Sequence, residues 1–132
     1  MILIGDKNIA CQSIEKITSI SDISSTLPNT TVLYEFDFEI LHYTQEHNLD
    51  SAIIVKDLKE VIYASTFTVK YIIVEKNIAK HAQDIVNNYM LDSKILIIIT
   101  SDDEIVENAL DEIDGVIYKS VVENGIKQTQ CT

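Results

Sequence analysis

Residues 94–120 read KILIIITSDDEIVENALDEIDGVIYKS, and this stretch decides the fold. Five residues from Ile95 to Ile99 form an apolar run that is rich in β-branched side chains. Apolar residues then recur at three- and four-residue steps from Ile105 to Ile113, and a second apolar run follows at Val116–Tyr118. An unbroken run fits a strand that is covered on both faces, and the spacing after it fits an amphipathic helix. The stretch therefore predicts a strand, a helix and a parallel strand.

The same alternation occupies most of the chain. Further apolar runs and helix-spaced segments precede the quoted stretch. The runs lie at 2–4, 31–36, 52–55 and 71–74, and the helical segments at 38–45, 58–65 and 78–90. Repeated strand–helix–strand units form right-handed crossovers in α/β domains. The sequence therefore predicts a three-layer α/β fold of the flavodoxin-like or receiver-like kind, with a mostly parallel sheet of about five to six strands.

The totals limit the domain organisation. At 132 residues the chain suits one compact domain, residues 1–132, and is too short for a complete eight-stranded β/α barrel. Only three glycines and one proline occur, so no linker divides it. The last residues, VVENGIKQTQCT, are polar, and we expect a frayed tail from about residue 121.

Charge excludes some partners. All ten basic residues are lysines, and 21 acids give a net charge of −11. An acidic surface without arginine repels phosphate backbones, so nucleic-acid binding is not expected. No apolar run is long enough to span a bilayer and no leader is recognisable, which favours a cytoplasmic protein that does not bind membranes. The richness in Lys, Ile and Asn without Arg suggests an AT-rich bacterial genome.

Motifs for catalysis are missing from the sequence. The two cysteines, Cys11 and Cys131, lie near opposite ends without metal-ligand spacing, and we interpret them as reduced and incidental. There is no GxSxG, HExxH or P-loop motif. The three histidines are scattered and are interpreted as surface residues.

Ser101 and Glu104 have the spacing of a capping box at a helix start. The hydroxyl of the first residue would accept a backbone N–H, and the glutamate would reach back to the N–H of the cap. Asp102 and Asp103 would then lie in the first turn, where the helix dipole favours negative charge. This cluster of acids is thus explained by local structure.

Other polar residues follow the predicted strands directly. Ligands of open α/β sheets bind at the carboxyl edge, where strand ends meet. The residues at that edge are Asp6, Glu35, Asp37, Lys56, Glu75, Thr100 and Lys119. Carboxylates with a lysine opposite could hold a divalent cation and an anion. Alternatively, they are ordinary solvated strand ends.

Residues 94–120 resemble the last strand–helix–strand portion of the receiver domains of two-component response regulators. A looser likeness extends back to Thr31. The resemblance implies that Thr100 is the switch hydroxyl, Lys119 the lysine that pairs with the phosphoryl group, and Asp37 a metal-binding acid. Glu75 falls where the phosphoacceptor aspartate belongs. The candidate pocket is therefore Glu35, Asp37, Glu75, Thr100 and Lys119, with Asp37 and Glu75 as candidate ligands of Mg²⁺.

The differences from receiver domains indicate that the phosphotransfer chemistry has been lost. Glutamate replaces aspartate at position 75, and the Pro and Gly that usually follow the acceptor are absent from EKNIAKHAQ. Ser120 replaces the common proline, and a full final helix is hard to find. The resemblance therefore implies a non-enzymatic receiver-like domain that binds another protein, needs no cofactor and has a degraded phosphotransfer site. We expect Glu75 to point toward Lys119 or Thr100.

Two alternatives remain open. One is a small ligand-binding or enzymatic α/β domain that uses the same strand-end residues. The other is suggested by residues 52–75, which are similar to the βαβ units of phosphate-binding β/α barrels, although no Gly-rich loop is present.

A shortage of predicted helices bears on assembly. Few apolar residues follow the last strand, so one side of the sheet is expected to lack a cover. We therefore expect a homodimer or an obligate protein partner that buries Val116–Val122 together with the helix Ile105–Ile113.

Overall fold

The computed structural model describes residues 1–26 and 28–126 as an α/β domain with one parallel sheet. The sheet has seven strands in the order β1-β7-β6-β5-β4-β3-β2, and every neighbouring pair is parallel. Their bounds are β1 (Ile2–Ile4), β2 (Ile14–Lys16), β3 (Thr31–Glu35), β4 (Ser51–Ile54), β5 (Tyr71–Val74), β6 (Lys94–Ile99) and β7 (Gly115–Tyr118).

Helices connect successive strands from β3 to β7, as the alternating pattern predicted. A 3₁₀ helix, η1, joins β2 to β3. The helices are η1 (Ile20–Ser25), α1 (Phe38–Glu46), α2 (Leu58–Thr66), α3 (Lys76–Asn88), α4 (Glu104–Leu110) and α5 (Lys119–Asn124).

The predicted fold class is confirmed, with seven strands instead of five to six. Each predicted apolar run forms a strand. The additional strand is β2, which is three residues long and reads Ile-Glu-Lys, so no apolar run marks it. Helix α4 ends earlier than predicted because Glu112 has a φ of 62°, a left-handed conformation that an α-helix cannot continue through.

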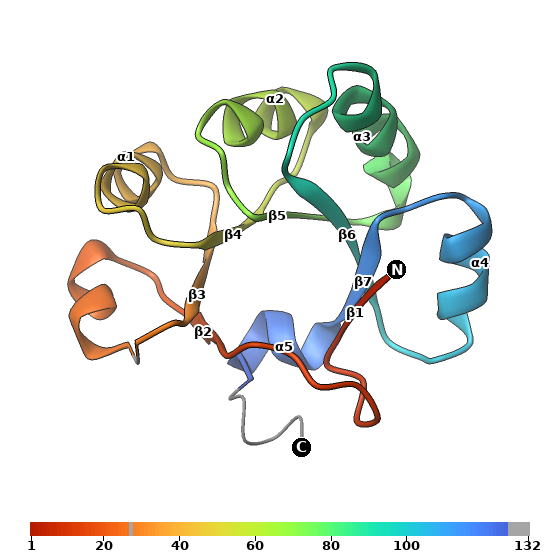
Figure 1. The fold of residues 1–132 in the computed structure, drawn as a ribbon, viewed down its shortest axis with the longest axis horizontal. Helices are drawn as coiled ribbons and strands as arrows, with labels where there is room; N and C mark the ends of the chain where they lie inside the picture. Colours follow the sequence, from red (N-terminus) through yellow and green to blue (C-terminus); the bar gives the residue numbers. More distant parts are fainter. Residues whose placement is uncertain (27, 127–132) are drawn as a thin grey trace.

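The sheet curls around an axis, and its strands follow one another in chain order from β2 to β7 (Figure 1). Only β1 departs from this order, because it pairs with β7 at the opposite edge from β2. Helices α1 to α4 lie outside the curl, and α5 lies near the opening between the edge strands β2 and β1 (Figure 1). No closed eight-stranded barrel is formed by the described residues, as expected for a chain of this length.

Side chains on alternate strand positions enter two separate cores. In β3, Val32 and Tyr34 pack against the outer helices, whereas Leu33 points into the curl. The outer core receives Leu41, Val61 and other apolar residues of α1 to α4. Burial of both faces explains why the strands are apolar at consecutive positions.

Helix α5 covers the inner core. Val121 and Val122 are buried with Ile4, Leu33 and other residues that point into the curl. The helix contacts β2, β6 and β7. The prediction of a frayed tail from about residue 121 is therefore wrong for residues 121–126, because two valines suffice to seat a short helix in the curl. Residues 127–132, including Cys131, lie outside the described part.

Helix α5 also covers part of the apolar surface that was expected to be exposed. Val116, Ile117, Val121 and Val122 are all buried within the chain, so this part of the predicted contact surface is already covered. What remains exposed on that side belongs to α4, where Val106 is 66% and Leu110 is 78% exposed.

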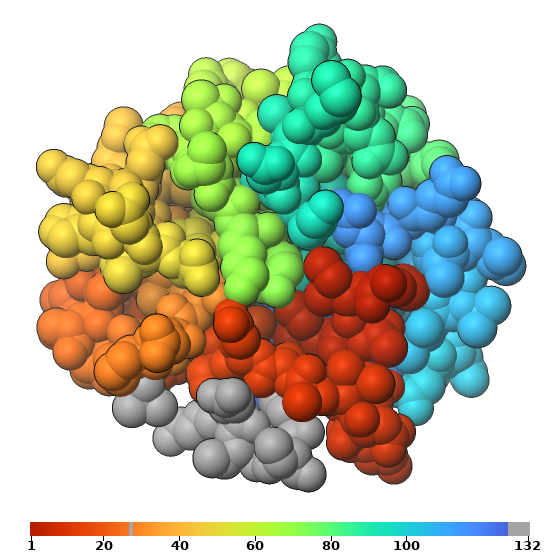
Figure 2. Space-filling model, in the orientation of Figure 1, coloured from red at the N-terminus to blue at the C-terminus, as the bar shows by residue number. Residues whose placement is uncertain are grey.

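The first residues of the chain complete the sheet. Strand β1 approaches β7 so closely that a Cβ on Gly115 would lie 2.5 Å from the carbonyl oxygen of Ile2. Figure 2 shows the N-terminal segment, in red, covering the middle of the face that this view presents. Among the helices that the structure describes, none has the length and apolar character needed to cross a bilayer.

Candidate functional site

All five candidate pocket residues lie at the carboxyl edge of the sheet. Glu35 ends β3, Asp37 precedes α1, Glu75 follows β5 and Thr100 follows β6. Lys119 is the first residue of α5, directly after β7. A shared edge is necessary for a common site, but the side-chain contacts decide whether the residues converge.

Asp37 is the N-cap of α1. Its carboxylate oxygen Oδ1 accepts the backbone N–H groups of Glu39 and Ile40 at 2.9 and 3.3 Å. These bonds satisfy donors that a helix start otherwise leaves open. The carboxylate is therefore engaged in starting the helix.

Thr100 is held by Glu104 of the following helix. Carboxylate oxygen Oε2 of Glu104 accepts the backbone N–H of Thr100 at 2.8 Å and of Ser101 at 3.1 Å, and the Thr100 hydroxyl at 3.3 Å. The Ser101 hydroxyl accepts the N–H of Asp103, and not that of Glu104, at 3.2 Å. The N–H donated by Thr100 is the main cause that lowers the pKa of Glu104. Glu104 reaches back to the Ser101 N–H as predicted, but the rest of the predicted capping box is wrong. The Ser101 hydroxyl does not accept from Glu104, and α4 begins at Glu104 with Asp103 as its N-cap, so Asp102 and Asp103 precede the helix.

Lys119 pairs along its own helix. Its Nζ lies 3.9 Å from Oε1 of Glu123, one turn further on in α5, and both side chains are well exposed. Among the described residues no hydrogen bond or ion pair joins Glu75 to Lys119 or to Thr100. Glu75, Lys119 and Thr100 therefore do not converge as expected. Instead, Thr100 pairs with Glu104, and Lys119 pairs with Glu123.

Glu35 and Glu75 do share a hollow, but with a different lysine. It has a volume of about 330 Å³ and is lined by Glu35, Ile54, Val55, Lys56, Glu75, Asn77, Ile78 and Ile98. In the sheet, β4 lies between β3 and β5, so Lys56 at its end stands between the two glutamates. A flavodoxin-type order of 2-1-3-4-5 would instead make the first and third strands neighbours. Sequence reasoning placed Lys56 at this edge but left it out of the pocket, because run lengths do not give strand order.

The charged groups of this hollow are open to solvent. Glu35, Lys56 and Glu75 are exposed, and within residues 1–26 and 28–126 none of their charged side-chain atoms forms a hydrogen bond or ion pair. The same part of the chain contains no group of three or more His, Cys, Asp or Glu side chains arranged to hold a metal ion. The hollow offers a lysine between two carboxylates and no assembled metal centre.

A second hollow at this edge was missed because β2 was missed. It has a volume of about 290 Å³, and Lys16 and Thr18 from the end of β2 line it together with Glu35 and Asp37. Asp22 of η1 accepts the Thr18 N–H at 3.0 Å, which lowers the pKa of Asp22. The residues around β2, SIEKI, neither alternate nor form an apolar run, so the sequence carries no strand signal on this side.

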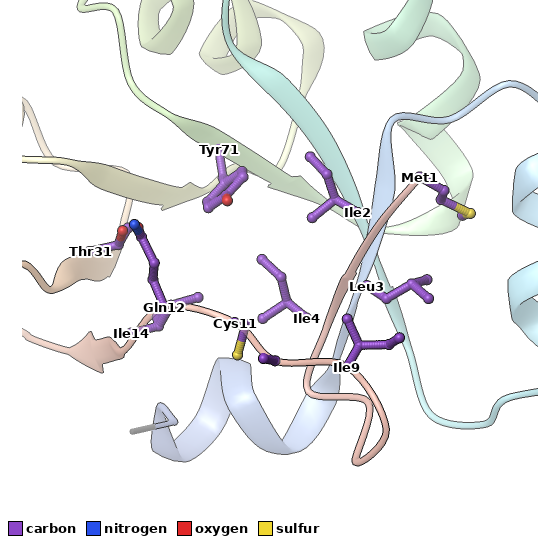
Figure 3. A pocket seen from close by; sticks show the side chains of 11 residues that line it. Met1, Ile2, Leu3, Ile4, Ile9, Cys11, Gln12, Ile14, Thr31 and Tyr71 are labelled. Carbon is purple, nitrogen blue, oxygen red and sulfur yellow. The ribbon is translucent and has the colours of Figure 1, made fainter. Parts of the chain in front are cut away.

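A third cavity lies at the opposite end of the curl, near the amino ends of the strands (Figure 3). It has a volume of about 240 Å³ and is lined mainly by aliphatic side chains of β1, β2 and residues 9–12. Tyr71, Gln12 and Thr31 lie at its side, and Gln12 accepts a hydrogen bond of 2.9 Å from Lys70. No Asp, Glu, His or Lys side chain lines this cavity, and its titratable side chains are those of Cys11 and Tyr71.

Aromatic rings gather on the outer surface between α1 and α2. Phe36 contacts Phe38 at 5.0 Å between ring centroids, and Phe38 contacts Tyr63 at 5.2 Å and Phe67 at 6.4 Å. His42 packs edge-on against Phe67 at 4.8 Å. We call these five residues the aromatic cluster. It contains all three phenylalanines of the chain.

Comparison with known protein families and with curated proteins found no match to this sequence.

Proposed function

We propose that the chain is a non-enzymatic, receiver-like α/β domain that acts by binding another protein, with a degraded phosphotransfer site. The observation that carries the proposal is the local pairing of Thr100 with Glu104 and of Lys119 with Glu123. In the receiver resemblance these two residues would contact a phosphoryl group, and Glu75 would stand at the acceptor position. The proposal retains the cytoplasmic location and the bacterial origin expected from the sequence.

Exposed apolar side chains support the binding role. Phe38, Ile62, Tyr63, Val106 and Leu110 are each at least 40% exposed. Large aromatic and aliphatic side chains are enriched in the buried centres of protein interfaces.

Self-association is the other form of partner binding expected from the sequence. Acids surround the exposed residues of α4, namely Asp102, Asp103, Glu107, Asp111 and Glu112. Two copies that met along α4 would bring these charges together at a net charge of −11 each, which opposes close approach. We therefore favour a different protein as partner. A dimeric mass in light scattering at micromolar concentration would instead support self-association.

Amide chemical shifts during a Mg²⁺ titration test the degraded site. The ¹⁵N-labelled protein is titrated with Mg²⁺ alone and then with Mg²⁺ and beryllofluoride, a phosphoryl mimic. We expect weak shifts spread over the acidic surface and no further change with the mimic. Saturable shifts that converge on Asp37, Glu75 and Thr100 would overturn the proposal, because they require an intact metal and phosphoryl site.

The hollow around Lys56 favours a second candidate function, the binding of a small ligand at the carboxyl edge. A lysine between two glutamates could orient a zwitterionic molecule that carries both an anionic and a cationic group. Titration with glycine as the simplest zwitterion gives the check. Saturable shifts confined to Glu35, Lys56 and Glu75 would favour this candidate over the first.

A further inference from the structure

We infer that the aromatic cluster is a docking surface for a basic, apolar segment of a partner protein. This inference rests on the proposed function and names the surface and the chemistry of the partner. It follows from the exposure of the rings, from their mutual geometry and from the charges around them.

The cluster is fixed to the fold at its base and open at its top. Phe36 and Phe67 are half-buried and pack against the outer core. Phe38 is 46% exposed and Tyr63 is 40% exposed. Rings that are held from below lose little conformational freedom when a partner covers them, which favours binding.

The geometry of the rings favours side chains of a protein over flat ligands. Phe38 meets Phe36 at an interplanar angle of 78° and Tyr63 at 84°. These pairs stand nearly perpendicular, and Phe38 is tilted by 57° against Phe67, so the rings form no continuous flat platform for a row of stacked bases. An uneven apolar surface of this kind suits interdigitating aliphatic or aromatic side chains.

The charges around the cluster select a basic partner. Asp37 and Glu39 flank Phe38 along the chain, and Asp57 and Glu60 lie at the start of α2. Lys56 and Lys59 are the nearby cations, and Nζ of Lys59 lies 5.9 Å from the ring centroid of Tyr63. Tyr63 thus already accepts a cation over its face, and a lysine or arginine of the partner could approach Phe38 in the same way.

The same charges disfavour the other occupants of an apolar surface. A second copy of this chain and an anionic membrane both carry negative charge, which is repelled by an acidic rim. A protein segment with large apolar side chains and flanking lysines or arginines can pack against the rings and also pair with the acids around them.

Binding of a defined peptide tests the inference. The probe is an amphipathic helical peptide of leucine and lysine only, and the controls are a peptide with glutamate for lysine and one with serine for leucine. We expect the leucine–lysine peptide to shift amides of α1 and α2 around Phe38 and Tyr63, and both controls to bind at least about tenfold more weakly. Equal binding of the serine–lysine peptide would overturn the inference, because charge alone would then suffice.

Matched variants assign the binding to the cluster. Phe38→Ala and Tyr63→Ala should each weaken binding of the leucine–lysine peptide by about tenfold, the loss typical of a central interface residue. Tyr89→Ala, at a ring that is 74% exposed on the end of α3, should leave it unchanged. Glu39→Lys should weaken binding without removing a ring, whereas Asp92→Lys, at an exposed loop, should have a smaller effect. Circular dichroism confirms that each variant is folded.

The remaining outcomes are also decisive. If the leucine–lysine peptide does not bind, or if Tyr89→Ala weakens its binding as much as the cluster variants do, the aromatic cluster is not a docking surface. The proposed function would still be tested separately by the Mg²⁺ titration. A dimeric mass that Phe38→Ala makes monomeric would assign the cluster to a second copy. Binding to phosphatidylserine vesicles that Phe38→Ala abolishes would assign it to a membrane. Either result overturns the inference of a basic protein partner.

Discussion

The side-chain oxygen Oε1 of Gln83 in α3 accepts a hydrogen bond of 2.8 Å from the backbone N–H of Asp114, the residue directly before β7. The carboxylate of Asp114 in turn accepts the backbone N–H of Ile95 in β6 at 2.9 Å. Gln83 is almost fully buried. One buried glutamine thus connects a helix to the amino ends of two neighbouring strands.

Replacing Gln83 with leucine should destabilise the protein. The change leaves the Asp114 N–H without its acceptor in a buried position, which costs about 1–3 kcal/mol of the free energy of unfolding. Urea denaturation measures the loss. Gln45→Leu, at an exposed position near the end of α1, serves as the control. A change for Gln83→Leu within about 0.5 kcal/mol of that for the control would contradict a structural role for this bond.

The hydroxyl of Tyr34 provides a second test inside the outer core. It lies 3.0 Å from the Thr44 hydroxyl and donates to the Ser51 hydroxyl at 3.2 Å, and all three side chains are buried. Burial raises the pKa of Tyr34 above 10.0. Tyr34→Phe should therefore lower the free energy of unfolding by about 1–2 kcal/mol, because two buried hydroxyls lose a partner. Tyr89→Phe, at an exposed ring, should change it by less than about 0.5 kcal/mol.

Periodicity and run length were sufficient to predict most of the fold. Apolar runs marked six of the seven strands because those strands are buried on both faces. They did not mark β2, which has only Ile14 as a large apolar residue and lies at an edge. The role of Val121 and Val122 was also missed, because two valines in a polar segment carry no periodic signal, although the curl leaves room for one short helix.

For the candidate site, the sequence could predict only the edge of the sheet at which its residues lie. Parallel strands place their ends together, so the sequence could identify Glu35, Glu75 and Thr100 as residues of the same edge. Which of them meet depends on strand order and on local bonds. Because the strands β3, β4 and β5 are neighbours in chain order, Lys56 lies between Glu35 and Glu75. The carboxylate of Glu104 accepts the hydrogen bonds of Thr100. Neither relationship follows from spacing alone.

Gly115 is expected to be intolerant of any side chain. A Cβ there would lie 2.5 Å from the carbonyl oxygen of Ile2 and 2.6 Å from its Cβ, both in the neighbouring strand β1. Gly115→Ala should push β1 away from β7 and lower the free energy of unfolding by about 1–3 kcal/mol. Hydrogen exchange should quicken at the Ile2 amide, which donates to the Asp114 carbonyl at 3.0 Å. Unchanged protection of that amide would show that the two strands adapt.

Removal of the Lys119 charge should have little effect on stability. The Nζ to Oε1 distance to Glu123 is 3.9 Å, and the two side chains are 62% and 57% exposed. Exposed pairs of this kind contribute about 0–1 kcal/mol. Lys119→Met should therefore change the free energy of unfolding by less than about 1 kcal/mol in urea denaturation. A larger loss would indicate that Lys119 has a contact beyond the pair with Glu123.

The bonds between Glu104 and the residues before α4 should make that turn sensitive to acid. Donation by the Thr100 N–H lowers the pKa of Glu104 below its ordinary value of 4.5. The stabilisation is therefore fully present above pH 4.5 and is lost as the pH falls through the lower folded pKa. The Thr100 and Ser101 amide shifts should titrate together with the Glu104 carboxyl carbon, at a midpoint below 4.5. In Glu104→Gln this titration should disappear, whereas Glu112→Gln, at an exposed acid beyond α4, should leave it in place. A midpoint at or above 4.5 for Glu104 would contradict a carboxylate held by these donors.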